Sequence, residues 1–417
     1  MFLKQIFKKY YDNELFKASF ILLVLLNISN FLNYLFHFIM GRMLGPVSYG
    51  ILATLTSIIY IFSVPTNSIQ TVIARYAAKY NINNDYGKIK AMFKDMIKKA
   101  GFAALLAFIV YLIVSIFIKE YVKIPYLLLV ITGIYLFGAF ISPAGIGILQ
   151  GMKKFWAWGW NSIFNSIIKI IISVILVFLG FEAYGPILGF LLGVFASLVI
   201  IFPSIKEVIH ANEENVKISL FSKNDFPLLL AVFVITLMYT LDIIFAKIFF
   251  SPEIAGRYSV ISMIGKMIFF ASSSISSAMF PLSSEKFFRD SRDKAPDIAK
   301  KTFIVIGLLC LVSAIASILC PEFIIKLLFG SSYLQFSKLL IFDIGAFSLI
   351  ALTNTIVLYK LSINELKMRH SILLLLFLII QIGSFLLFNN TIQLFGKVFF
   401  ISSIITFLGS VLFIRAK

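Results

Sequence analysis

Charged residues are scarce in this sequence. Asp, Glu, Lys and Arg make up 13% of the 417 residues, whereas hydrophobic residues make up 60% and the mean hydropathy is +0.99. A soluble domain usually carries about 25% charged residues. The scarcity excludes a soluble catalytic domain and predicts an all-α polytopic membrane protein rather than an enzyme.

Cysteine and histidine are also rare. Cys310 and Cys320 lie in or beside one apolar run, so we expect buried free thiols and no disulfide or metal pair. The three histidines are too scattered for a metal site. No G-x-x-x-x-G-K-[ST] phosphate loop occurs, and Gly145, Gly147 and Gly151 have the wrong spacing for a dinucleotide loop. We expect no cofactor and no catalytic residue, so transport has to be driven by a gradient or by the membrane potential.

Long apolar runs are what the sequence does contain. Each is long enough to cross about 30 Å of hydrocarbon at 1.5 Å per residue. The predicted spans are 17–41, 49–73, 99–118, 124–149, 157–180, 184–205, 226–250, 258–282, 302–320, 336–361, 370–388 and 393–414. The sequence therefore predicts about twelve transmembrane helices, the first two of them joined by a tight turn, GRMLGPVSYG.

The turn between the first two spans has a counterpart half a chain later. Pro46 and Gly50 in the first turn correspond to Pro252 and Gly256 in SPEIAGRYS, at the same offset in sequence. This offset is close to half the chain length. It indicates two tandem halves.

The polar stretch 206–225 is the expected boundary between the halves. It separates an N-terminal six-helix lobe, 1–205, from a C-terminal six-helix lobe, 226–417. Because six helices precede this cytoplasmic linker, both lobes have the same orientation, which is a parallel pseudo-twofold repeat.

Lysine and arginine alternate between rich and poor loops. The rich set comprises the amino terminus, 74–99, 150–156, 206–225, 283–301, 360–369 and the carboxyl terminus. It holds 27 basic residues, against seven in the opposite loops. Basic residues gather in cytoplasmic loops. We therefore expect a multi-pass protein of the cell (plasma or inner) membrane with both termini cytoplasmic, and the net charge of +18 then needs no nucleic-acid partner.

Polar residues form stripes at helical spacing on several predicted spans. A helix in lipid turns polar groups towards protein or a water-filled cavity. The stripes are Asn27, Asn30, Tyr34 and His37 on the first span, Ser63, Asn67 and Gln70 on the second, Ser162, Asn165 or Ser166, Lys169 and Ser173 on the fifth, and Ser259, Ser262, Lys266, Ser273 and Ser277 on the eighth. Isolated hydroxyl groups can simply join helices, but stripes that contain His37, Lys169 or Lys266 favour a cavity.

Three lysines lie inside predicted spans. Lys169 is near the middle of its span, where a cation needs a partner or water. Lys266 and Asp242 have similar depth on adjacent helices, which is compatible with either an ion pair or a direct substrate role. Lys247 is close to a helix end, and snorkelling is the preferred interpretation. The candidate cavity residues are Lys169, Lys266, Asp242, Arg42, Arg257, His37, Asn30, Asn67 and Gln70.

Several segments carry a family resemblance. They are LGPVSYG, LDIIFAKIFFSPEIAGRYSV with the following helix that ends in MFP, ILQGMKKF, and FLGFEAYGPILGFLLG. Together they resemble the polysaccharide-transport, or oligosaccharide-flippase (Wzx-like), family of the multidrug/oligosaccharidyl-lipid/polysaccharide (MOP) exporter superfamily. The resemblance implies a MATE-like pair of six-helix bundles that moves a lipid-linked oligosaccharide of the polyprenyl-phosphate type to the outer leaflet by alternating access. The coupling ion, H⁺ or Na⁺, stays open.

Two other functions compete with this one. A multidrug or cation antiporter of the same superfamily would use intramembrane carboxylates, for which Asp242 and Asp343 are the candidates, whereas the buried lysines favour an anion. A membrane glycan polymerase or ligase would be expected to carry a sizeable outer loop, and the outward loops here are short. The flippase interpretation is therefore preferred.

Overall fold

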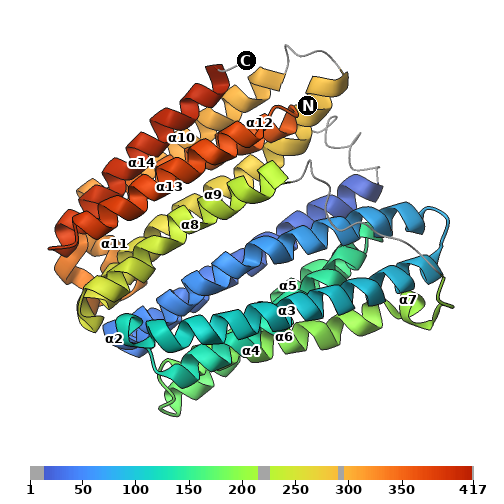
Figure 1. The fold of residues 1–417 in the computed structure, drawn as a ribbon, viewed down its shortest axis with the longest axis horizontal. Helices are drawn as coiled ribbons and strands as arrows, with labels where there is room; N and C mark the ends of the chain where they lie inside the picture. Colours follow the sequence, from blue (N-terminus) through green and yellow to red (C-terminus); the bar gives the residue numbers. More distant parts are fainter. Residues whose placement is uncertain (1–13, 215–225, 290–294, 416–417) are drawn as a thin grey trace, which may run out of the picture. The chain divides into compact units, whose positions relative to one another are not determined.

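The computed structural model describes residues 14–214, 226–289 and 295–415, and within these ranges it contains helices and no strand (Figure 1). The long helices are α2 (Glu14–Asn81), α3 (Tyr86–Val122), α4 (Tyr126–Gly151), α5 (Phe155–Phe178), α6 (Tyr184–Ser204), α8 (Phe226–Phe249), α9 (Pro252–Arg289), α10 (Ala295–Leu319), α12 (Leu340–Ser362), α13 (Met368–Leu387) and α14 (Ile392–Arg415). The short elements are α7 (Lys206–His210), α11 (Pro321–Leu328) and the 3₁₀ helix η2 (Ser331–Leu339).

The predicted helix number is confirmed once α2 is divided at its kink. Eleven helices in the described ranges are long and apolar enough to cross a membrane, and α2 is one of them. Its 68 residues would extend about 100 Å, roughly three bilayer cores, so it holds the first two predicted spans. The break is at Gly45, with φ 69° and ψ 176°. Glycine suits this positive φ, and Pro46 holds the preceding residue out of the helical region.

Two helices are longer than the apolar runs that predict them. α3 begins at Tyr86 instead of residue 99, and α9 runs from Pro252 to Arg289 instead of 258–282. The extra turns of α3 carry several lysines. Hydropathy identifies only the part of a helix that lipid surrounds, so helices that continue into water are underestimated.

The chain divides into two compact units. Unit 1 comprises Met1–Met43, Pro65–Glu120 and Ile124–Leu220, and unit 2 comprises Leu44–Val64, Tyr121–Lys123 and Phe221–Lys417. The lobe boundaries expected from the sequence, 1–205 and 226–417, stay a prediction, and residues 215–225 of the linker lie outside the described residues.

Within unit 1, α5 and α6 pack closely because α6 carries glycines four residues apart. A Cβ at Gly189 would lie 2.1 Å from Ser173 Oγ and 2.8 Å from the main-chain oxygen of Lys169. A Cβ at Gly193 would lie 3.2 Å from the main-chain oxygen of Asn165. Small residues at this spacing let membrane helices approach closely. The pair fixes the part of α5 that carries Lys169.

Within unit 2, the two turns that the sequence relates to each other are in direct contact. A Cβ at Gly50 would lie 2.8 Å from Cα of Gly256, and a Cβ at Gly256 would lie 1.8 Å from the main-chain oxygen of Pro46. Gly50 in turn faces the main-chain oxygen of Pro252. Each proline therefore faces the glycine of the other turn, the reciprocal contact expected of elements related by a twofold axis.

Ion pairs hold α7 and the residues after it against other parts of unit 1. Lys154 Nζ lies 2.5 Å from Glu207 Oε2, and Lys94 donates a hydrogen bond to Glu213. The hydrogen bonds from Lys154 and Lys94 lower the pKa of the Glu207 and Glu213 carboxyl groups, respectively, below their usual range. Exposed pairs of this kind add little stability. They position the start of the 206–225 segment against α3 and α5.

Candidate substrate and ion sites

A row of polar side chains joins α2 to α5 in unit 1. Ser29 Oγ donates a hydrogen bond of 3.1 Å to the main-chain oxygen of Ser162 and lies 3.0 Å from Ser166 Oγ. One turn further along each helix, Lys169 donates a hydrogen bond to Asn33 Oδ1. Residues four and seven positions apart share a helix face. The polar stripe predicted for the fifth span is therefore present and meets a partner stripe on α2.

Lys169 lies at the end of this row, and its ammonium group contacts two aromatic rings. Its Nζ is 4.5 Å from the ring centre of Phe36 on α2 and 4.6 Å from that of Phe190 on α6, and the residue is 4% exposed. Both distances are in the range of cation–π contacts. Within the described residues, the contacts of this ammonium group are an amide oxygen and two ring faces, with no carboxylate. A buried cation held only by neutral groups attracts an anion.

The other predicted cavity residues of unit 1 differ from one another in exposure and in contacts. His37 is buried beside Phe36, with ring centres 5.2 Å apart, whereas Asn30 and Arg42 are exposed. Gln70 Nε2 donates a hydrogen bond of 3.0 Å to Gln150 Oε1 on α4. The side chain of Asn67 lies outside the described residues.

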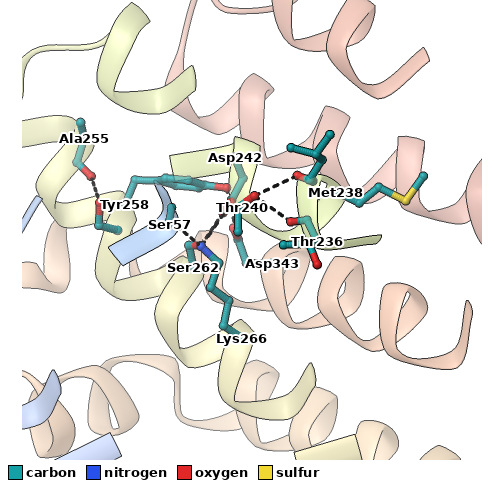
Figure 2. Close-up of polar contacts among 12 residues, drawn as sticks. Ser57, Thr236, Met238, Thr240, Asp242, Ala255, Tyr258, Ser262, Lys266 and Asp343 are labelled. Carbon is teal, nitrogen blue, oxygen red and sulfur yellow. Dashed lines mark hydrogen bonds and ion pairs between the residues drawn. The ribbon is translucent and has the colours of Figure 1, made fainter. Parts of the chain in front are cut away.

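Unit 2 contains a buried ion pair, as the depth of its partners suggests. Lys266 Nζ on α9 lies 3.4 Å from Asp242 Oδ1 on α8, with both side chains at most 1% exposed. Figure 2 shows Lys266 pointing towards Asp242, with Ser57 and Ser262 beside it. Ser262 donates a hydrogen bond to Asp242 Oδ2, and Ser57 Oγ is 3.5 Å from Lys266 Nζ. Lys266 thus has a carboxylate counterion, whereas Lys169 has none among the described residues.

A second carboxyl group belongs to the same cluster. Tyr258 donates a hydrogen bond of 2.9 Å to Asp343 Oδ1, while Asp343 Oδ2 has no hydrogen-bond partner among the described residues. Asp242 and Lys266 both act electrostatically on Asp343. Two carboxylates against one ammonium leave one excess negative charge, which is costly in a dry interior. The cluster is therefore suited to hold a proton or a monovalent cation.

Two basic residues near the α8–α9 junction differ in their surroundings. Arg257 Nη2 lies 2.7 Å from Glu253 Oε1, one turn away on α9. Lys247 is 1% exposed, so the snorkelling interpretation is wrong, because a snorkelling ammonium group would reach the surface. Its Nζ is buried without a hydrogen-bond partner among the described residues.

Sequence reasoning missed several residues of both clusters. In unit 1 these are Asn33, Phe36 and Phe190, and in unit 2 they are Ser57, Tyr258 and the cluster role of Asp343. The sequence does carry a signal for Asn33. It follows Ser29 by four residues, the helical spacing that also separates Asn165 from Lys169. The aromatic residues carry no such signal, since phenylalanine occurs at 46 positions.

The family model described as polysaccharide biosynthesis protein matches residues 15–287, more than half of the chain. The chain belongs to this family. A second family model, MatE, matches residues 227–360. No curated protein matches the chain.

Solved structures share the fold at low sequence identity. An inward-facing multidrug resistance MATE family transporter of the MOP superfamily has a TM-score of 0.71 at 15% identity, over 94% of this chain and 98% of that one. The lipid II flippase MurJ, in an inward closed conformation, has a TM-score of 0.65 at 19% identity, over 94% and 88%. A MOP superfamily transporter from Pyrococcus furiosus has a TM-score of 0.60 at 16% identity, over 96% and 95%. These likenesses show that the chain shares the fold of these proteins, and eleven helices in the described ranges are long and apolar enough to cross a membrane.

Proposed function

We propose that the chain moves a lipid-linked oligosaccharide of the polyprenyl-phosphate type from the cytoplasmic to the outer leaflet by alternating access. Membership of a polysaccharide biosynthesis family supports this substrate class. The observation that carries the proposal is Lys169, a buried ammonium group near mid-span whose described contacts are all neutral. A diphosphate head group needs such a fixed cation along its path.

Lys169 can exchange its neutral partners for phosphate oxygens. Cation–π contacts contribute about 0.5–2 kcal/mol, and an ammonium–phosphate hydrogen bond adds the attraction of two opposite charges, which the amide oxygen of Asn33 does not supply. An arriving phosphate would therefore displace the contacts with Phe36, Phe190 and Asn33. The same neutral groups hold the ammonium in place again after the substrate leaves.

The cluster around Asp343 is the proposed coupling site for H⁺ or Na⁺. Its excess carboxyl group is compensated when a proton or cation is bound, and the cluster carries excess negative charge when it is empty. Asp242, Lys266 and Asp343 lie on α8, α9 and α12, respectively. Binding of the ion would therefore shift the equilibrium between two arrangements of these three helices.

Replacing Asp343 with asparagine should remove the response to the coupling ion. Wild-type transport in proteoliposomes should change about 5- to 150-fold with the driving gradient, the usual range of coupling between sites. The Asp343→Asn variant should transport at one rate with or without a gradient, whereas Glu322→Gln, at an exposed position on α11, should behave as wild type. A variant that keeps the full gradient dependence would exclude Asp343 as the coupling group.

The orientation remains a proposal based on basic loop residues: both termini and residues 206–225 are cytoplasmic. In a chain with Cys310 and Cys320 replaced by serine, a cysteine at exposed Asn83 should react with a membrane-impermeant maleimide only after the cells are opened. A cysteine at exposed Asn390 should react in intact cells. The reverse pattern would invert the topology.

The cation antiporter is the second candidate, favoured by one observation. Tyr60, Tyr239 and Phe270 form an aromatic group with ring centres 5.4–6.2 Å apart, and Tyr239 precedes Asp242 by three residues on α8. Aromatic faces together with buried carboxylates suit lipophilic cations. Deleting the gene in its host decides between the two. Loss of surface glycan with glycan-lipid held in the inner leaflet supports the flippase, whereas normal glycan and new sensitivity to cationic dyes supports the antiporter.

A further inference from the structure

The last turn of α8 holds a buried ammonium group that the proposed transport and coupling sites do not use. Lys247 is 1% exposed, and its Nζ has no hydrogen-bond partner among the described residues. Buried polar groups in folded proteins are almost always hydrogen-bonded, and an isolated buried charge is costly. Lys247 therefore needs a ligand that the described side chains do not supply.

A second lysine lies at the same end of α8. Lys123 Nζ donates a hydrogen bond of 3.3 Å to the main-chain oxygen of Phe250. Phe250 follows Lys247 by three residues, which is about 4.5 Å along a helix axis. Both lysines therefore lie at the C-terminal end of α8, and both belong to unit 2. One of the two is buried and the other is exposed.

The backbone at Lys123 supports a role for its side chain. Its φ is 51°, in the left-handed region, directly after the end of α3. Glycine is the usual residue at such a position, because a Cβ makes this conformation less favourable. A lysine at this position makes the backbone less stable than a glycine would, and it places an ammonium group at the end of α3.

The helix dipole does not account for both charges. The C-terminal end of a helix is equivalent to about half a negative elementary charge. Lys123 donates to the main-chain oxygen of Phe250 at this end and Lys247 lies in its last turn, so two positive charges meet about half a negative charge and leave an excess of positive charge there. The two carboxylates nearest to Lys247 in sequence are paired with other residues: Asp242 with Lys266 at 3.4 Å and Glu253 with Arg257 at 2.7 Å.

We propose that Lys247 and Lys123 form a binding site for a phosphate-type anion at the C-terminal end of α8. Phosphate oxygens accept hydrogen bonds from two ammonium groups at once, and the exposed Lys123 gives access from the surface while the buried Lys247 strengthens the attraction. The anion is either a free phosphate compound or the head group of an anionic phospholipid. The site does not depend on which substrate the chain transports.

Thermal unfolding of the purified full-length protein with two probes tests this site. In neutral detergent, sodium pyrophosphate is compared with sodium chloride at equal ionic strength, and phosphatidylglycerol is compared with phosphatidylcholine. A bound anion at about ten times its Kd should raise Tm by roughly 2–4 °C in a saturable manner. In a Lys169→Met background, which removes the other proposed phosphate contact, Lys247→Met keeps an apolar side chain of similar length and should abolish the shift. Lys119→Gln, one turn before Lys123, should keep it.

Each outcome decides the proposal. A shift with pyrophosphate that Lys247→Met removes identifies a site open to free phosphate compounds, and a shift with phosphatidylglycerol alone that the variant removes identifies a lipid head-group site. No shift with either probe, or equal shifts with and without Lys247→Met, overturns the proposal. If Lys247→Met does not fold, Lys123→Gln replaces it, because that side chain is exposed and the variant should still lose the shift.

Discussion

Replacing Lys169 with methionine should lower the rate of glycan-lipid transport at least about a hundredfold. Removing one partner of a buried charge pair costs about 3–5 kcal/mol, and each 1.4 kcal/mol is a factor of ten in rate. The diphosphate would lose that partner as it passes α5. Membrane insertion and abundance should be unaffected, because methionine fills a similar volume and removes a buried charge that has only neutral contacts. Transport in proteoliposomes, normalised to reconstituted protein, measures the effect.

Two further variants separate charge from packing. Lys169→Arg keeps the positive charge but has to fit a larger group between Phe36 and Phe190, so about a tenth of the activity should remain. Ser166→Ala removes one hydroxyl of the same row without changing the charge, and its rate should stay within about threefold of wild type. If Lys169→Met transports as well as wild type, Lys169 is a structural lysine and carries no anion.

Replacing Gly256 with alanine should strongly destabilise unit 2. The new Cβ would lie 1.8 Å from the main-chain oxygen of Pro46 and 2.4 Å from its carbonyl carbon. These are backbone atoms, which cannot rotate away as a side chain does, so the turn and α9 have to separate. Overpacking in a well-packed core typically costs 1–3 kcal/mol, and we expect a cost of at least about 3 kcal/mol here.

The matched control is Gly307→Ala on α10 of the same unit. A Cβ at Gly307 meets nothing within 4 Å, and alanine favours a helix over glycine, so this variant should be as stable as wild type or slightly more. Thermal unfolding in detergent should show a Tm lower by about 5 °C or more for Gly256→Ala. An unchanged Tm for Gly256→Ala would mean that the two turns do not pack as closely as the structure shows.

The membrane spans could be predicted because hydropathy is a local property. The twelve apolar runs correspond to the eleven membrane-length helices of the described ranges once α2 is divided at Gly45, and the turns that hold Pro46/Gly50 and Pro252/Gly256 pack against each other. Helix ends in water were missed, as α3 shows, because beyond the hydrocarbon no apolar run marks the continuing helix.

The candidate sites were only partly predictable. On α5 the stripe of Ser166 and Lys169 was found, since both polar residues and their spacing are visible in the sequence. On α2 two stripes with the same spacing compete, and the one containing Asn30 was chosen although Asn33 makes the contact with Lys169. Periodicity gives the faces of a helix but not which face meets a partner. That choice depends on packing against α5 and α6.

The two charged residues with unexpected surroundings show the same limit. Lys247 was interpreted from its depth alone, yet its environment is set by the end of α3 and by Phe250. Asp343 is far in sequence from Tyr258, Asp242 and Lys266, and only tertiary structure brings the four together. Contacts between distant segments leave no pattern in a single sequence.

The most direct test is transport of a polyprenyl-diphosphate oligosaccharide by the purified protein in liposomes. The lipid is placed in both leaflets, outer head groups are cut by an impermeant glycosidase, and the protected fraction is followed with time. We expect the fraction protected in protein-free liposomes to become accessible when wild type is present and to stay protected with Lys169→Met. Continued protection with wild type, together with efflux of a lipophilic cation from the same liposomes, would contradict the flippase and identify an antiporter.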